Sequence, residues 1–268
     1  MVVLSGLDAT FSPIRPRPYL RPPSWVAPER KTVARRRLTS GMVPPLALDI
    51  DGTLTTASGR IDARVFELLP DWDAPVVLAT GKAFPYPVAL AHFLGRAETV
   101  IAENGGVVHV DGETAVLGDP EAPRAVVEAF RERGGDLGWG ARDTVNRWRE
   151  TEVALSLDAD ETLLREVAAA AGGDVEVVDT GYAYHVKSTG VSKGRGLERV
   201  GDALGLAPDE FVAVGDSEND VSTFAVAGES YAVANADVAA RDAADTVLAE
   251  SYMDGTASVL EELRARSE

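Results

Sequence analysis

The segment Leu46–Thr55, LALDIDGTLT, is an apolar run that ends in two aspartates, Asp49 and Asp51, followed at once by Gly52. The apolar run predicts a buried β-strand. Residues two apart in a strand point to the same side, so both carboxylates can address one ligand, and Gly52 allows the backbone to turn away sharply. Paired carboxylates suit phosphoryl transfer, with one as nucleophile and metal ligand and the other as general acid and base. Taken alone, however, Asp-Gly after a strand is as typical of a plain turn.

Two further segments place phosphate-binding groups next to a predicted strand and a predicted helix. The run Pro75–Lys82, PVVLATGK, ends near Thr80 and Gly81, whose hydroxyl and backbone N–H groups can bind a phosphate. Lys193 lies at the start of a helical pattern, where the helix dipole does not favour a cation, and an anion nearby would explain it. The simpler alternatives are a strand followed by a loop, and a solvated lysine.

A fourth segment, Phe211–Asp220, FVAVGDSEND, combines a short apolar run with Asp216 and Asp220. A helix that begins near Ser217 brings the two aspartates together, because residues four apart lie on one helical face. Aspartate at the start of a helix is also ordinary capping. Asp49, Asp216 and Asp220 offer only hard oxygen ligands, and the chain has no cysteine and no clustered histidine, so these residues favour Mg²⁺.

In this order the four segments resemble the motifs of the haloacid dehalogenase superfamily of phosphohydrolases, and the resemblance covers nearly the whole chain after Met42. The sequences AENGG at 102–106, GVSKG at 190–194 and VAN at 233–235 are similar to the branch that carries a large C2-type cap between the second and third motifs. Within this branch the chain most resembles the archaeal enzymes that hydrolyse 2-phosphoglycolate. Lys82 departs from the pattern, since Arg or Asn often follows the Thr-Gly, which leaves the local substrate contact open.

The resemblance implies a Mg²⁺-dependent phosphomonoester hydrolase that acts through an aspartyl-phosphate on Asp49. Asp51 would protonate the departing alkoxide and later take a proton from the attacking water. This double role requires a pKa above the ordinary value of about 3.9, and burial beneath a closing cap would raise it. The implied metal ligands are the side chains of Asp49, Asp216 and Asp220 and the backbone carbonyl of Asp51. The residues expected to hold the transferring oxygens are Thr80, Gly81 and Lys193.

The leading substrate is 2-phosphoglycolate, a small phosphorylated acid. The runner-up is a phosphatase of sugar phosphates or of mannosyl-3-phosphoglycerate, to which this type of cap is also similar. A phosphomutase, which passes the phosphoryl group back to a sugar, and a catalytically silent sugar-phosphate sensor are the alternatives from other classes. The sensor is disfavoured because all the charged motif residues are present, namely Asp49, Asp51, Lys193, Asp216 and Asp220.

The segment Leu137–Glu150, LGWGARDTVNRWRE, holds three arginines, Arg142, Arg147 and Arg149, beside two tryptophans. One of these arginines could clamp a substrate carboxylate with two hydrogen bonds. Surface ion pairs in an acidic protein are the simpler interpretation. His185, in a later predicted strand, could likewise face the pocket, although a hydrogen-bonded structural histidine is the favoured interpretation.

The charge of the chain divides at residue 41. Residues 1–41 carry eight Lys or Arg and two Asp or Glu, whereas residues 42–268 carry 18 and 41, a net charge of −23. The acidic part contains only three lysines, which favours adaptation to high salt, where molar salt screens the self-repulsion. An ordinary acidic protein is the alternative. The absence of cysteine excludes disulfides and says little more about compartment.

The basic segment 1–41 is rich in Pro and Arg and lacks an apolar period, so we expect it to be disordered. Met42 follows directly, before the first strand, and a mistaken upstream start codon is the simplest account of the extension. A basic tail can bind nucleic acid or anionic lipid, but this attraction weakens steeply with salt, so neither partner is expected. This segment has no continuous apolar core of a signal peptide, and no later stretch reaches the length of a spanning helix, so the enzyme is expected in the cytoplasm. The oligomeric state stays open.

Alternating predicted strands and helices indicate an α/β fold with a Rossmann-like three-layer core and a parallel sheet. The core strands are expected at 46–50, 76–79, 99–102, 211–214, 231–233 and 246–248, with helices at 63–69, 87–94 and after 191. The pattern then differs within the insert, with a hairpin at 107–117, helices at 120–133 and 161–171, and strands at 153–157, 175–178 and 182–187. We therefore expect residues 42–104 and 188–268 to form the core and residues 105–187 to form an inserted α+β cap.

Overall fold

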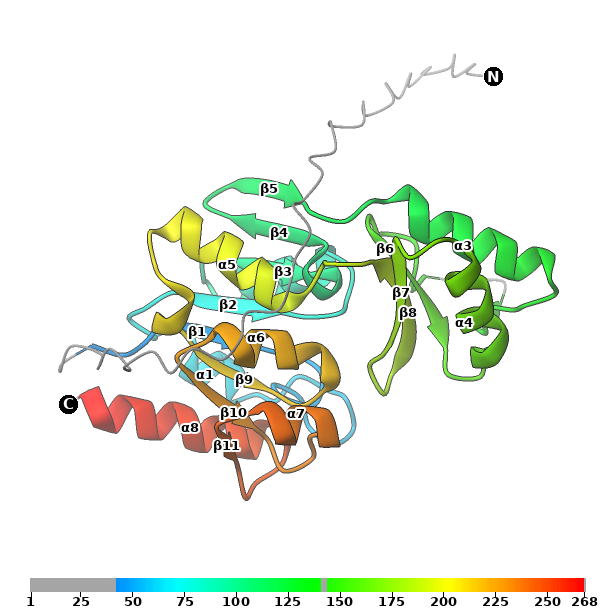
Figure 1. Cartoon of the computed structure of the whole chain (residues 1–268). Helices are drawn as coiled ribbons and strands as arrows, with labels where there is room; N and C mark the ends of the chain where they lie inside the picture. Colours follow the sequence, from blue (N-terminus) through cyan, green and yellow to red (C-terminus); the bar gives the residue numbers. More distant parts are fainter. Residues whose placement is uncertain (1–41, 141–143, 268) are drawn as a thin grey trace, which may run out of the picture.

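The computed structural model describes residues 42–140 and 144–267 of the chain. These residues form one eight-stranded and one three-stranded sheet, and the small sheet with its two helices is set to one side of the large one (Figure 1). The basic segment 1–41, predicted to be disordered, lies outside the described residues, as does Arg142. None of the described helices combines the length and the apolar character that a transmembrane segment requires.

The large sheet is mostly parallel. Its strands, in the order in which they lie side by side, are β11 (Thr246–Val247), β10 (Glu229–Ala232), β9 (Val212–Gly215), β1 (Leu46–Leu48), β2 (Val76–Ala79), β3 (Val100–Ala102), β4 (Val107–Val110) and β5 (Glu113–Val116). The first six of these strands run parallel to one another, and β1 lies between β2 and β9. Their apolar sequences fit this position, because both faces of a parallel sheet are covered.

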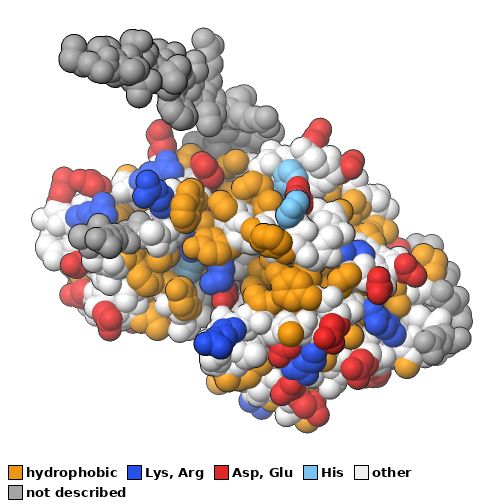
Figure 2. All heavy atoms as spheres, turned by 180° about the vertical axis from the view of Figure 1, so that it is seen from behind, with side chains coloured by type: hydrophobic (Ala, Val, Ile, Leu, Met, Phe, Trp, Pro, Cys, Tyr) orange, Lys and Arg blue, Asp and Glu red, His pale blue; other side chains and the backbone are white. Residues whose placement is uncertain are grey.

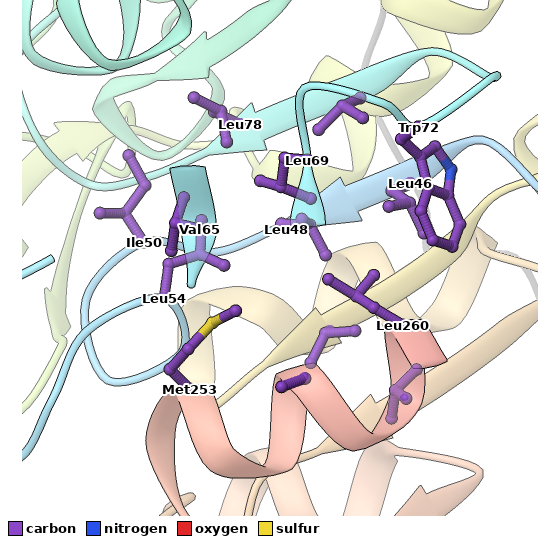
Figure 3. Close-up of a cluster of buried hydrophobic side chains, with 14 of the residues drawn as sticks. Leu46, Leu48, Ile50, Leu54, Val65, Leu69, Trp72, Leu78, Met253 and Leu260 are labelled. Atoms are coloured by element: carbon purple, nitrogen blue, oxygen red, sulfur yellow. The ribbon is translucent and has the colours of Figure 1, made fainter. Parts of the chain in front are cut away.

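Helices cover both faces of the large sheet and create two apolar clusters. Leu46 and Leu48 of β1 point to one face, and Ala47 points to the other, as alternation along a strand requires. The first face packs against α1 (Val65–Leu68), α2 (Pro85–Phe93) and α8 (Tyr252–Ser267), and part of this cluster is drawn in Figure 3. The second face packs against α5 (Lys193–Leu204), α6 (Val221–Val226) and α7 (Val238–Ala243). The expected three-layer α/β core is thus confirmed.

Helix α8 was not predicted from the sequence. Its apolar positions are interrupted by Gly255, Thr256 and Ser258, which weaken the helical pattern. Packing explains the helix, because Met253 and Leu260 are fully buried against the sheet. Gly255 is required by close approach, since a Cβ at this position would lie 2.5 Å from the carbonyl oxygen of Glu250.

The predicted hairpin at 107–117 forms, but it belongs to the large sheet. Strand β4 pairs antiparallel with β3, so the hairpin extends the core sheet, whereas the sequence pattern placed it in the cap. Val108 and Val110 explain this position, because their side chains join the same apolar cluster as α5. The turn between the strands has Asp111 and Gly112 at positive φ (53° and 77°), the geometry that an Asp-Gly hairpin favours.

The small sheet consists of β6 (Glu152–Ser156), β8 (Ala183–Ser188) and β7 (Val175–Asp179), all antiparallel, in this order. Two amphipathic helices, α3 (Glu121–Glu132) and α4 (Glu161–Ala170), cover one face, where Tyr184 and Val186 join their apolar cluster. His185 and Lys187 alternate with these residues and therefore point to the opposite face. The small sheet thus carries a polar face that is directed away from its own helices.

Acidic and basic side chains are spread around the outline of the surface in Figure 2, and hydrophobic side chains gather between them.

Because residues 42–268 carry a net charge of −23, we expect the unfolding temperature to rise between about 0.1 M and about 2 M KCl, as the Debye length falls from about 10 Å to below 3 Å. Divalent cations would partly replace this screening, so the rise should be steepest in EDTA. Thermal melts followed by circular dichroism measure it, and a flat melting temperature would rule out adaptation to high salt.

Candidate active site

The four motif segments meet at one edge of the large sheet. Asp49 follows β1, Thr80 follows β2 and Asp216 follows β9, so all three stand at the carboxyl ends of neighbouring parallel strands. This edge is where open α/β sheets place their ligand sites. Lys193, the first residue of α5, reaches the same edge from the second face.

Lys193 is completely buried between two carboxylates. Its Nζ donates to Asp49 Oδ1 at 2.6 Å and to Asp220 Oδ1 at 2.7 Å. Burial disfavours the charged ammonium, but Asp220 and Asp49 outweigh this effect and raise the pKa of Lys193 above its usual value. A cation at the start of a helix is therefore stabilised by two anions, which agrees with the nearby anion that the sequence pattern suggested and not with a solvated lysine.

Asp49, Asp216 and Asp220 form a compact carboxylate cluster whose ligand atoms all lie within 4.8 Å of one another. Burial and, to a smaller extent, the negative charge of the neighbouring Asp220 raise the pKa of Asp216 to about 7. Burial also raises the pKa of Asp49, against the opposing effect of Lys193. Asp216 Oδ1 is buried without a hydrogen-bond partner. A divalent cation fits these residues, because it would ligate this oxygen and offset the repulsion.

The loop after β1 approaches this cluster closely. Gly52 has φ +77°, and a Cβ at this position would lie 2.0 Å from Asp216 Oδ2, so both its conformation and its lack of a side chain are needed. Asn235 holds the loop in place, because its Nδ2 donates to the carbonyl oxygen of Gly52 at 3.1 Å and its Oδ1 accepts from the N–H of Tyr252. The VAN segment thus has a local structural role at the site.

The structure leaves the Asp51 side chain partly exposed, contrary to the expected burial beneath a cap. This side chain is 47% exposed, and its Oδ1 pairs with Lys82 Nζ at 3.1 Å. Both residues project into a cleft, which explains their exposure. Thr80 is buried behind them, and its Oγ accepts from the N–H of Lys82 at 3.0 Å, while Gly81 lines the cleft itself.

The cleft is a cavity of about 370 Å³ that lies between the core and the small sheet. Such a volume suits a small ligand. The core contributes residues from three of the four motif segments, and the small sheet contributes the wall that faces them, whereas Lys193 is buried and does not line the cleft. The residues of this wall are Arg149, Thr180, Gly181, Tyr182 and His185.

A buried polar network joins the two sheets through Glu152 of β6. Its carboxylate accepts from Arg149 and, at 2.8 Å, from Asn104 Nδ2 of the core, and His185 Nδ1 lies 2.9 Å from it. Arg149 also donates to the carbonyl oxygen of Gly81 at 2.8 Å. Burial opposes the ionised form of Glu152, but His185 and Arg149 lower its pKa to about 2. The ionised carboxylate of Glu152 therefore holds both Arg149 and His185 in place.

The other arginines of this segment differ from Arg149. Arg147 is exposed, and Arg142 lies outside the described residues. Of the two candidates for a carboxylate clamp that the structure describes, only Arg149 lines the cleft, and its charge is already balanced by Glu152. His185 is buried and hydrogen-bonded, in line with the favoured structural interpretation, yet it also lines the cleft.

Sequence reasoning assigned no role to two buried residues that follow β3. Glu103 and Asn104 both have positive φ (51° and 53°) in the 3₁₀ turn η1 (Glu103–Gly105). Glu103 accepts hydrogen bonds from Glu150 N–H and from the N–H and hydroxyl of Thr151, although burial raises its pKa to about 7. Asn104 Oδ1 accepts from Asn219 Nδ2 at 2.9 Å. The available signal was the Asn-Gly pair, which favours left-handed backbone.

The Glu152→Gln variant should be less stable by about 3–5 kcal/mol, because it leaves the buried Arg149 without its counter-charge. The exposed pair of Glu166 with Arg133 offers a matched control, and Glu166→Gln should cost less than about 1 kcal/mol. Since the pKa of Glu152 falls from 4.5 to about 2 on folding, its contribution is complete above pH 4.5 and lost toward pH 2. Urea unfolding at fixed salt and several pH values measures both effects. Equal costs for the two variants would contradict the buried pair.

The chain belongs to the family of haloacid dehalogenase-like hydrolases, whose pattern matches residues 46–133 and 155–260. The resemblance seen in the four motifs is thereby confirmed. A phosphoglycolate phosphatase of Halorubrum lacusprofundi is 92% identical over 227 residues, which cover 85% of this chain and 100% of the relative. A phosphoglycolate phosphatase of Natronomonas pharaonis is 55% identical over 225 residues, which cover 83% of this chain and 99% of that relative. A crystal structure of a Thermoplasma acidophilum protein superposes with TM-score 0.71 at 25% identity, over 83% of this chain and 99% of that one.

Proposed function

We propose that this protein is a Mg²⁺-dependent phosphatase that hydrolyses 2-phosphoglycolate to glycolate and phosphate through Asp49. The observation that carries the proposal is the Lys193 ammonium between Asp49 and Asp220, beside the unpartnered oxygen of Asp216. This arrangement suits a nucleophilic carboxylate that must approach an anionic phosphate. The names of the relatives, at 92% and 55% identity, support the substrate.

The carboxylate cluster is the proposed Mg²⁺ site. Its protein ligands would be the side chains of Asp49, Asp216 and Asp220 and the backbone carbonyl of Asp51. Asp220 is already oriented, because its Oδ2 accepts from the N–H groups of Asp216 and Ser217 at 3.0 and 3.2 Å. When bound, Mg²⁺ would offset the repulsion between these carboxylates and the phosphate dianion.

In the proposed reaction Asp49 attacks phosphorus, the ester P–O bond breaks, and an aspartyl-phosphate forms. Asp51 gives its proton to the departing alkoxide and then takes a proton from the water that hydrolyses the intermediate, which releases phosphate and restores Asp49. The position of Asp51 supports both contacts, because its half-exposed side chain lines the cleft in which the alcohol part of the ester and the attacking water would lie. Thr80, Gly81 and Lys193 would hold the transferring oxygens.

The small sheet with α3 and α4 is the proposed cap, which closes the site and selects the ester. Two observations support this division. The polar face of its sheet carries His185 toward the cleft, and Arg149 and Glu152 hydrogen-bond to the core loops. Because the hairpin β4–β5 lies in the core sheet, we propose that the cap begins after it and ends with β8.

The substrate proposal is tested by phosphate release from a panel of esters with Mg²⁺ in molar KCl. The panel contains 2-phosphoglycolate, several sugar phosphates and mannosyl-3-phosphoglycerate, and kcat/KM is compared across it. We expect the highest value for 2-phosphoglycolate. A higher value for a sugar ester would reassign the substrate, and transfer of phosphate between sugar positions without its release would indicate a phosphomutase.

A further inference from the structure

Among the described residues, the cations near the cleft differ in how they are paired. Lys193 is buried between Asp49 and Asp220, and Arg149 is held by Glu152. Lys82 is different, because it lines the cleft, its side chain is 29% exposed, and its ionic partner is a half-exposed carboxylate. Of these described cations, Lys82 is therefore the one that can exchange its present partner for a ligand at low cost.

We propose that Lys82 binds the carboxylate of the substrate and thereby selects phosphorylated small acids over neutral phosphate esters. This inference rests on the proposed function, since it assigns the second anionic group of 2-phosphoglycolate to a residue. The need for such a residue follows from the charges of the cleft. Apart from the cations, its lining includes Asp49, Asp51, Asp216 and Asp237, which would repel a second negative group.

Lys82 lies where the alcohol part of the bound ester is expected. Asp51 is the proposed donor to the ester oxygen, so the group bonded to that oxygen lies beside Asp51. Lys82 Nζ is 3.1 Å from Asp51 Oδ1 and therefore stands next to the leaving group. In 2-phosphoglycolate a single methylene separates the ester oxygen from the carboxylate. One ammonium can donate to Asp51 and to this carboxylate at the same time, because it has three N–H donors.

Two aromatic rings hold the ammonium over the cleft. Lys82 Nζ lies 5.7 Å from the centre of the Tyr86 ring in α2 and 5.2 Å from that of Tyr182. Cation–π contacts of this kind stabilise and orient an ammonium group. Tyr182 lies in the turn between β7 and β8, and its ring stacks on that of Trp139 at a centroid distance of 6.3 Å. The small sheet thus positions a lysine that belongs to the core.

The test compares 2-phosphoglycolate with 2-hydroxyethyl phosphate, in which a hydroxymethyl group replaces the carboxylate. The wild type should have the higher kcat/KM for 2-phosphoglycolate, with Mg²⁺ and one fixed KCl concentration. In Lys82→Gln the ratio of the two values should fall about ten- to a hundredfold, the scale of a lost hydrogen bond between charged groups. Lys82→Arg, which keeps the charge, should retain most of the ratio. Arg133→Gln removes a positive charge from the exposed surface and should leave the ratio unchanged.

Tyr182 supplies a second and independent readout. Tyr182→Leu should lower the same ratio, whereas Tyr182→Phe keeps the ring and should preserve it. If Lys82→Gln reduces both substrates equally, or leaves the ratio unchanged, Lys82 does not bind the carboxylate. If the wild type accepts both esters equally, carboxylate selection itself is refuted. If the wild type releases no phosphate from 2-phosphoglycolate but does so from another ester, the proposed substrate fails instead.

Discussion

Asp49→Asn should abolish phosphate release, with a loss in kcat on the order of 10⁴-fold or more, the scale seen when a catalytic nucleophile is removed. The amide is a poor nucleophile, and the variant also loses one negative ligand of the proposed metal site. The fold should persist, because the buried Lys193 keeps its bond to Asp220 at 2.7 Å. Single-turnover kinetics and a thermal melt, both at the same salt concentration, measure the two effects.

A matched control for Asp49→Asn exists in the same cleft. Asp237 lines the cavity and caps α7, where its Oδ1 accepts from the N–H of Ala240 at 2.8 Å. Asp237→Asn removes the same charge and keeps an oxygen acceptor for the cap, so its activity should stay within about tenfold of the wild type. Residual turnover of Asp49→Asn within tenfold of the wild type would overturn the assignment of the nucleophile.

With alkyl phosphates, Asp51→Asn should slow each of the two proton-transfer steps by about 10²- to 10⁴-fold, and kcat should fall on the same scale. The asparagine keeps a similar shape and an oxygen that can accept from Lys82, so the cleft should stay intact. The loss should depend on the leaving group, because p-nitrophenolate departs without a proton. The first step with p-nitrophenyl phosphate should therefore be less impaired than the first step with 2-phosphoglycolate.

Rapid-quench measurements separate the two steps for Asp51→Asn. Slow water activation would let the phosphorylated enzyme accumulate with p-nitrophenyl phosphate, and a burst of p-nitrophenolate would report this. Normal hydrolysis of alkyl phosphates by the variant would remove Asp51 from the mechanism. If the first step is slowed equally with both leaving groups, Asp51 does not protonate the leaving group and acts only by positioning the substrate.

Much of the fold was readable from local patterns. The strands β1, β2, β3 and β9 and the cap helices α3 and α4 lie within a few residues of their predicted ranges. These elements are encoded by short apolar runs and by amphipathic periods. The hairpin after β3 shows the limit of such patterns, since its turn was predictable but its sheet was not. Its place depends on burial of Val108 and Val110 beside residues of α5 far along the chain.

In the candidate site, too, some residues could be predicted from local patterns and others could not. Five charged residues could be predicted as site residues because each lies at the end of a predicted strand or near the start of a predicted helix. Parallel strands bring such ends to one edge of the sheet. These residues are Asp49, Asp51, Lys193, Asp216 and Asp220. The cap contacts gave no comparable signal. Glu152, for example, is one acidic residue of a chain rich in them, and its burial became evident only with the small sheet in place.

The four motif segments were enough to predict the α/β class, the carboxylate cluster and the family, because these depend on residues close together in the chain and on their order. The pairing of the charged side chains, by contrast, became visible only in the folded chain, which shows which charges have a buried partner and which line the cleft. Arg149 meets Gly81 across 68 residues, and Lys82 meets Tyr182 across the cleft. Local periodicity does not encode such pairs, because burial and pairing arise from packing between distant segments.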